Sequence, residues 1–110
     1  NYCPLAFLEE SGRNFTPDKL PAAQLRELYA LCDRHLAATL TALAPTWALG
    51  VGGFAEKRLR AVLQGDAIAS DLARRIKIGQ ILHPSPASPA ANRGWEDAVN
   101  KQLALLGIIA

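Results

Sequence analysis

The sequence predicts an α/β fold, a three-layer α/β/α sandwich with a parallel central sheet, of which residues 1–110 form a partial domain. The short apolar segment 46–51 and the segment 76–83, in which apolar and polar residues alternate, are typical of strands, and a helical segment separates them. Strands joined through a helix pair in parallel by a right-handed crossover. A parallel sheet needs helices on both faces, which predicts the sandwich. Because two strands support a sheet poorly, we expect further strands before Asn1.

The amino-terminal part predicts a helix start and one long amphipathic helix. Thr16-Pro17 is typical of a helix start, because Thr can cap the first turn and Pro needs no amide hydrogen there. Pro21 favours a second start, and Pro45 ends the helix that follows after roughly 22 residues. We expect His35, within this helix, at its surface or boundary. The apolar side chains recur every three or four positions and are Leu25, Leu28, Tyr29, Cys32, Leu36, Leu40 and Leu43.

The rest of the chain predicts alternating strands and helices. The segment before the glycine turn at 50–53 fits a strand buried on both faces, and Gly65 ends the helix that follows it. Residues 66–75 favour a further helical turn or a loop. Prolines at 84, 86 and 89 exclude regular structure before the closing helix, which Gly107 ends. The main elements are expected as a strand at 46–51, a helix at 54–64, a strand at 76–83 and a helix at 95–106.

Composition places the chain among ordinary globular proteins. Half of the residues are apolar and 20% are charged, and no apolar run approaches the roughly 18 to 20 residues of a membrane helix. Glu9 and Glu10 interrupt the first apolar segment too early for a signal peptide. The net charge of +2 neither indicates nor excludes a nucleic-acid partner, since such proteins often carry positive charge on one face only. Lacking methionine and beginning at Asn1, the sequence is interpreted as a piece of a longer protein.

The reactive side chains exclude several kinds of site. Cys3 and Cys32 do not make a disulfide scaffold, and we expect two buried thiols in the reducing interior of a cell. Two histidines and two cysteines scattered along the chain do not form a zinc site, so no metal is expected. No Asp-His-Ser set, Cys-His-Asn set or carboxylate pair is apparent. The turn at 50–53 lacks the full spacing of a dinucleotide motif and its later acidic residue, so we interpret it as close packing and expect no cofactor.

Ligands of open α/β sheets bind beyond the carboxyl ends of the strands. His83 follows the last expected strand, the turn at 50–53 follows the first, and Asn1 would qualify if a strand ends before it. The prolines after His83 stiffen a loop that could enter a groove, and Arg93 could hold a phosphate with the amides of the last helix. The alternative is that His83 only ends a strand and the prolines only make a rigid turn.

Four blocks occur in the order seen in one enzyme family. They are Asn1-Tyr2-Cys3-Pro4-Leu5, then Ser11-Gly12-Arg13-Asn14 with Thr16-Pro17, then Gly50-Val51-Gly52, and finally His83-Pro84-Ser85-Pro86 with Asn92 and Gly94-Trp95. Over essentially all of its length the chain resembles the carboxy-terminal half of the single-strand-selective monofunctional uracil-DNA glycosylases. The resemblance implies a four-stranded parallel sheet between helices and hydrolysis of the N-glycosidic bond of uracil, and of some modified uracils, in DNA during base excision repair. It implies no metal or cofactor, and an intracellular protein that is a monomer when full length.

The resemblance implies roles for individual residues of this chain. Asn1 matches the family residue whose carboxamide meets both the N3 hydrogen and the O4 of uracil; cytosine would reverse both partners. His83 matches the catalytic histidine, a donor aimed at O2 of the departing base. The loop after it resembles the wedge that fills the gap left by a flipped nucleotide. The candidate DNA contacts there are Ser85, Pro86, Ala87, Ser88, Asn92 and Arg93.

The sequence also departs from the family pattern. Ala87 stands where some members place a bulky basic side chain, which predicts a weaker wedge and a preference for single strands or destabilised pairs. The family's water-positioning group and base-stacking aromatic come from motifs before Asn1, so we expect the 110 residues alone to be inactive and poorly folded. Two alternatives remain: a non-catalytic DNA-binding relative of the same fold, and a nucleotide-binding domain that uses the glycine turn.

Overall fold

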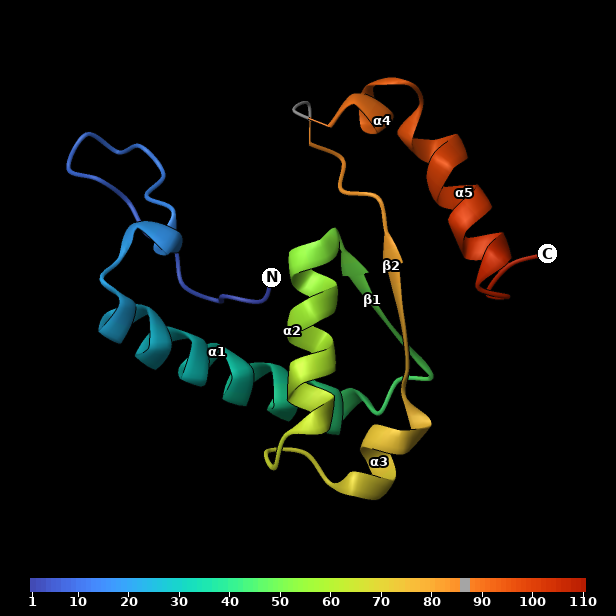
Figure 1. Cartoon of the computed structure of the whole chain (residues 1–110), viewed down its shortest axis with the longest axis horizontal. Coiled ribbons are helices and arrows are strands. Elements are labelled where there is room, and N and C mark those ends of the chain that lie inside the picture. The colour runs from blue at the N-terminus through green and yellow to red at the C-terminus, as the bar shows by residue number, and fades with distance from the viewer. Residues whose placement is uncertain (86–87) are drawn as a thin grey trace.

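The computed structural model describes residues 1–85 and 88–110, and it has an α/β arrangement of helices around a short parallel sheet (Figure 1). The predicted DNA contacts Pro86 and Ala87 lie outside the described residues. The elements along the chain are η1 (Pro17–Lys19), α1 (Ala22–Leu43), β1 (Trp47–Val51), α2 (Gly53–Gln64), α3 (Ser70–Arg75), β2 (Lys77–Ile81), α4 (Pro89–Asn92) and α5 (Trp95–Leu105).

The two strands pair in parallel, as predicted. Their register runs from Trp47 opposite Lys77 to Val51 opposite Ile81, and α2 and α3 form the connection between them. A Cβ atom on Gly50 would lie 2.3 Å from the amide nitrogen of Glu56, so α2 packs directly on this face of the sheet. The close-packing interpretation of the glycine turn is therefore supported by the geometry.

The opposite face of the sheet contacts the end of α5. Gly50 pairs with Gln80, so Gly79 points to the other face, because successive residues of a strand alternate between faces. A Cβ atom on Gly79 would lie 2.7 Å from Cδ1 of Leu106, the residue that follows α5. Helical segments thus contact both faces of the two-stranded sheet.

The buried core is small and lies where α1, α2 and the sheet meet. Large apolar side chains remain exposed elsewhere, among them Phe54 at 53% and Leu105 at 88%. The Cα radius of gyration is 15.8 Å, against the ~13 Å typical of a compact domain of this length. Figure 1 shows why: α1 and the segment before it extend away from the sheet. The core cluster consists of Ala37, Leu40, Ala48, Leu59, Val62, Ile68 and Ile76.

Two expectations about the elements were wrong. Burial in β1 alternates, with Ala48 buried and Val51 42% exposed, so the strand is not buried on both faces. Pro89 does not exclude regular structure but begins α4, since the first turn of a helix needs no proline amide hydrogen. The Ser88 side chain caps this helix by accepting a hydrogen bond from the amide of Ala91. No described helix is long and apolar enough to cross a membrane.

Candidate functional site

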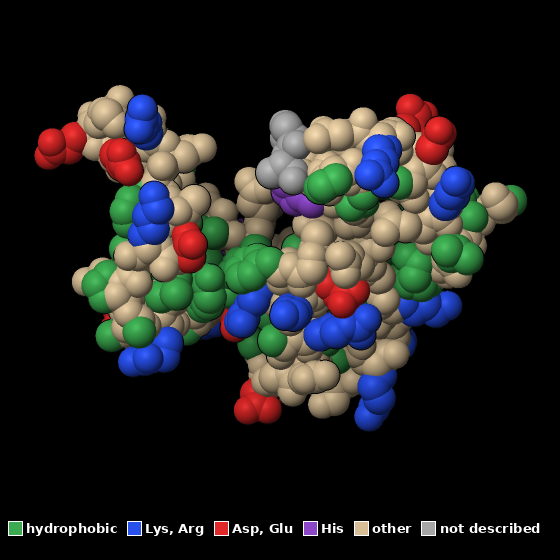
Figure 2. Space-filling model, turned by 45° about the horizontal axis from the view of Figure 1, so that its top comes forward, with side chains coloured by type: hydrophobic (Ala, Val, Ile, Leu, Met, Phe, Trp, Pro, Cys, Tyr) green, Lys and Arg blue, Asp and Glu red, His purple; other side chains and the backbone are tan. Residues whose placement is uncertain are grey.

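Asn1 and His83, which are 82 positions apart in the sequence, line the same cavity. The cavity has a volume of about 570 Å³ and lies at the carboxyl ends of the strands, where Val51 ends β1 and His83 follows β2 by two residues. In Figure 2 a histidine side chain lies beside a hollow in the surface. Besides these residues, the cavity is lined by Tyr2, His35, Leu36, Thr39, Leu49, Ala55, Leu59 and Pro84.

The imidazole of His83 has a defined orientation. The backbone N–H of Ser85 donates a 3.1 Å hydrogen bond to Nδ1 of His83. A ring nitrogen that accepts carries no proton, so the neutral imidazole holds its hydrogen on Nε2 and is a donor there. The amide that orients the ring thus comes from only two residues further along the chain. The sequence therefore supplies both the side chain and the backbone group that selects its tautomer.

Gly52 provides the surface on which His83 rests. A Cβ atom on Gly52 would lie 3.4 Å from Cβ of His83 and 3.7 Å from its Cδ2. Gly52 has φ +90°, a conformation that favours glycine, and its N–H donates to the carbonyl of Ile81 at 2.9 Å. The glycine turn thus extends the ladder between β1 and β2 and lies directly beside the His83 side chain.

Tyr2 anchors the segment that begins with Asn1. Its hydroxyl lies 2.6 Å from Oδ1 of Asp33 and 3.1 Å from the carbonyl oxygen of Tyr29, both on α1. The single hydroxyl hydrogen is placed best toward the nearer, charged acceptor. Nη2 of Arg58, on α2, lies 2.8 and 2.7 Å from the two oxygens of Asp33. One carboxylate therefore joins the amino-terminal segment to two helices.

Aromatic packing and electrostatics reinforce this anchor. The rings of Tyr2, Tyr29 and Phe54 pack edge-on or tilted with centroids 5.7 to 5.9 Å apart, and the Arg58 guanidinium lies 5.4 Å from the Tyr2 centroid. Burial and the hydrogen bond to Asp33 raise the pKa of Tyr2 above its ordinary value. The Asp33 carboxylate likewise raises the pKa of Arg58. The phenol is thereby held neutral beside a charged pair.

The predicted DNA contacts that the structure describes lie along the chain just beyond the cavity. The amide of Ser85 donates to His83, and the carbonyl of Ser85 accepts a 2.9 Å hydrogen bond from the amide of Ser88. Asn92 is the exposed last residue of α4. Arg93 is exposed between α4 and α5, near the start of the last helix as expected. The backbone of Ser85 therefore donates a hydrogen bond to the cavity residue His83, whereas Arg93 is exposed to solvent.

The two thiols differ in environment. Both cysteines are free, as predicted, but only Cys32 is fully buried while Cys3 is half-buried. Burial, and then the neighbouring Cys3, raise the pKa of the Cys32 thiol to about 11. Within residues 1–85 and 88–110, no three His, Cys, Asp or Glu side chains are grouped so as to hold a metal ion.

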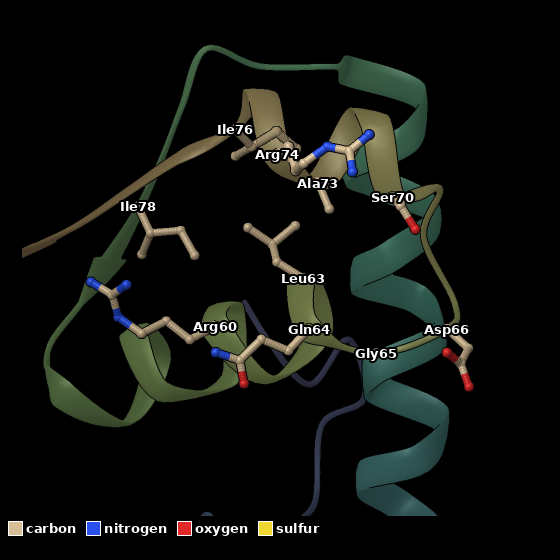
Figure 3. Close-up of a pocket in the computed structure, with 10 residues that line it drawn as sticks. All are labelled: Arg60, Leu63, Gln64, Gly65, Asp66, Ser70, Ala73, Arg74, Ile76 and Ile78. Atoms are coloured by element: carbon tan, nitrogen blue, oxygen red, sulfur yellow. The ribbon is translucent and has the colours of Figure 1, made fainter.

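A second hollow, of about 440 Å³, lies between α2, α3 and β2 and is lined by none of the predicted site residues. Arg60 and Arg74 border it, but Figure 3 shows their guanidinium groups pointing away from each other. Arg60 also lies 3.6 Å from the carboxylate of Glu56. The hollow therefore lacks convergent groups that would bind an anion.

Several residues at the site gave little signal in the sequence. His35 was expected at the surface or boundary of the helix; it is exposed, and it also lines the cavity with Thr39, one helical turn later. The spacing of four residues could have placed both on one face of α1. Asp33 and Arg58 could not have been found this way, because they reach Tyr2 from 31 and 56 positions along the chain. Their role arises from tertiary packing alone.

The chain is similar to known proteins over almost its whole length. No protein-family model matches it. The chain is 42% identical over 109 residues to the single-strand selective monofunctional uracil-DNA glycosylases of Rattus norvegicus and Mus musculus, and 40% identical to that of Bos taurus. The matches cover 99% of this chain but 37 to 38% of each relative. The chain thus spans a little more than a third of the length of these relatives.

Proposed function

We propose that this chain, which belongs to the single-strand-selective monofunctional uracil-DNA glycosylase family, is part of a hydrolytic enzyme that removes uracil, and modified uracils, from DNA. The observation that carries the proposal is the shared cavity of Asn1 and His83. The 40 to 42% identity to proteins of that name supports it independently.

Asn1 would read the base. Its carboxamide offers one acceptor and one donor, which match the N3 hydrogen and O4 of uracil. Cytosine presents the opposite pair, so both groups would lose their partners, and an unpaired buried polar group costs about 1–3 kcal/mol. The anchor formed by Tyr2 and Asp33 restrains the backbone next to the carboxamide. Selection of uracil would follow from this restraint.

His83 would stabilise the departing base. Cleavage of the N-glycosidic bond leaves the bonding electron pair on uracil, whose O2 gains negative charge, while water supplies the oxygen that bonds to the sugar. A neutral imidazole with its proton on Nε2 can donate to O2 as that charge develops. The Ser85 amide keeps this tautomer in place. By family resemblance the water-positioning group belongs to a segment outside these residues, so we expect the 110 residues alone to be inactive.

The segment after His83 would contact the DNA. Arg93 and Asn92 are exposed beside the start of α5 and suit a phosphate. Ser85, Pro86, Ala87 and Ser88 would form the wedge, in which the small Ala87 favours single-stranded or weakly paired uracil.

The same proposal extends to the rest of the molecule. Residues 1–110 would belong to one domain whose sheet gains further strands, giving a three-layer sandwich. The exposed apolar side chains, such as Phe54, support this view. We expect the intact protein to act as a monomer on DNA inside the cell, in the cytoplasm or nucleoid of a bacterium or the nucleus of a eukaryote.

The test is uracil release from a labelled single-stranded oligonucleotide by the intact protein. His83→Ala should slow release by about 10²- to 10³-fold while DNA binding persists. Asn1→Ala should reduce the preference for uracil over cytosine, and Arg26→Ala, on the exposed surface of α1, serves as the control. Wild-type protein that binds this DNA but releases no uracil would identify a non-catalytic relative instead. Equal release by wild type and both site variants would refute the assigned roles.

A further inference from the structure

The residue before His83 is held by two side chains of one helix. The parallel ladder ends where Gly52 donates to the carbonyl of Ile81, so Leu82 is the first residue of this segment beyond it. The N–H of Leu82 donates to Oε1 of Gln102 at 2.9 Å, and its carbonyl accepts from Nε1 of Trp95 at 2.6 Å. Both polar groups of the Leu82 backbone are therefore satisfied by α5.

The helix that supplies these groups is fixed close to the strand. Trp95 and Gln102 are seven residues apart, two turns of helix, so both lie on the face of α5 that meets β2. Gly79 permits this approach, because any Cβ there would overlap Leu106. The position of the two side chains is thus set by helix–sheet packing rather than by a mobile loop.

Fixing Leu82 also fixes His83. The Leu82 carbonyl lies in the same peptide plane as the nitrogen and Cα of His83, so the Trp95 bond orients the plane from which the imidazole extends. The Gln102 bond fixes the preceding plane. Beyond the ring, the Ser85 amide restrains Nδ1. Hydrogen bonds therefore restrain both the backbone that precedes His83 and the imidazole ring of His83.

We propose that Trp95 and Gln102 are positioning residues for His83, which act by holding the Leu82 peptide so that the imidazole keeps its place in the wall of the cavity. This inference rests on the proposed glycosylase function, since it concerns the same histidine. A displacement of about 1 Å in a reacting group can cost 10²-fold in rate. Removing either hydrogen bond should therefore reduce catalysis without removing any group that touches DNA.

The test is a double-mutant cycle in the intact protein, read as the single-turnover rate of uracil release at saturating DNA. Gln102→Leu removes the acceptor at similar volume, and Trp95→Phe removes the donor while it keeps an aromatic ring. Each substitution should slow uracil release roughly 10- to 100-fold in the otherwise wild-type protein. In a protein that already carries His83→Ala, each should slow release further by less than about 2-fold. Affinity for single-stranded DNA should stay within about 2-fold of wild type.

Matched variants separate positioning from a loss of structure. Gln102→Glu keeps an acceptor for the Leu82 amide and should restore most of the rate, whereas Gln24→Leu, exposed on α1, should change nothing. Equal losses of rate with and without His83 would overturn the inference while the proposed function stands. If Gln102→Leu does not fold, Trp95→Phe tests the inference instead, by its loss of rate with and without His83. An unchanged rate in His83→Ala would instead overturn the catalytic role of His83 on which the inference depends, and wild-type protein that releases no uracil would overturn the proposed function.

Discussion

The hydroxyl of Tyr2 and the carboxylate of Asp33 lie 2.6 Å apart, and this contact links the backbone next to Asn1 to helix α1. Arg58, on α2, donates to both oxygens of the same carboxylate. Such a bond to a charged acceptor is stronger than one between neutral groups. The cavity residue at the beginning of the chain is therefore linked to helices α1 and α2 through its neighbour Tyr2.

Tyr2→Phe should lower stability and base selection together. The variant keeps the ring contacts with Tyr29 and Phe54 but loses the bond to Asp33, worth about 1 kcal/mol for a partly exposed pair. Denaturant titration of the intact protein should show the loss, and excision of uracil should become less selective against cytosine. Tyr29→Phe, which leaves the Tyr2 bond in place, is the control. A selectivity unchanged from wild type would contradict the anchoring role.

The same contact predicts how stability depends on pH. Because the pKa of Tyr2 is raised in the folded protein, the native state keeps a proton that the unfolded chain releases above about pH 10. This contribution is fully present below pH 10 and is lost as the pH rises above it. Wild-type stability should fall more steeply than that of Tyr2→Phe between pH 10 and 11. Parallel curves for the two proteins would argue against a raised pKa.

Local sequence patterns predicted the helices and strands well, but they did not predict the tertiary contacts that hold the site residues. Pro21 and Pro45 bound α1, whose 22 residues match the predicted length, because helix starts and stops are local chemistry. The parallel pairing of β1 and β2 followed from their helical connection. The contacts of Asp33 and of Gln102 could not be predicted, since polar residues on helix surfaces look alike until the chain has folded. The positions of Asn1 and His83 at expected strand ends marked them as candidates and the resemblance supplied their roles, and the folded chain places both at one cavity.

Gly52→Ala should slow uracil release more than backbone strain alone explains. Alanine at φ +90° is strained, and its Cβ would contact His83 at 3.4 Å. Gly107→Ala is the matched control, since Gly107 has φ +80° and no atom within 4 Å of an added Cβ. Both variants should lose roughly 1–2 kcal/mol of stability, and Gly52→Ala alone should lose about tenfold in single-turnover rate. Equal rates in the two variants would exclude a contact effect on His83.

Cys32 should resist alkylation in the folded protein. The thiolate is the reactive form, and a pKa of about 11 leaves little of it near pH 8 in a fully buried side chain. Mass spectrometry after iodoacetamide treatment should find Cys3 modified first. Modification of Cys32 should accelerate as the pH approaches 11, and in denaturant both thiols should react alike. Rapid native labelling of Cys32 at pH 8 would show that the segment carrying Cys3 opens readily.

Ala87→Arg should shift activity toward duplex DNA. A bulky basic side chain in the wedge would offset more of the unstacking cost that a flipped base incurs, whereas a single strand has little stacking to lose. The measurement is the ratio of uracil release from duplex and from single-stranded oligonucleotides of one sequence. Ala90→Arg, in the exposed first turn of α4, adds the same charge beside the wedge. An equal gain on both substrates, or an equal gain from Ala90→Arg, would assign the effect to charge alone.

Arg93→Ala should weaken DNA binding mainly through electrostatics. Arg93 is exposed between α4 and α5, so its guanidinium can neutralise one phosphate and release the associated counterion. For single-stranded DNA, the slope of log K against log salt concentration should become shallower by about 0.7, with little change in base selection. Arg74→Ala, exposed on α3 and bordering the other hollow, is the charge-matched control. If both variants change the slope equally, binding reflects net charge and Arg93 has no specific contact with the phosphate backbone.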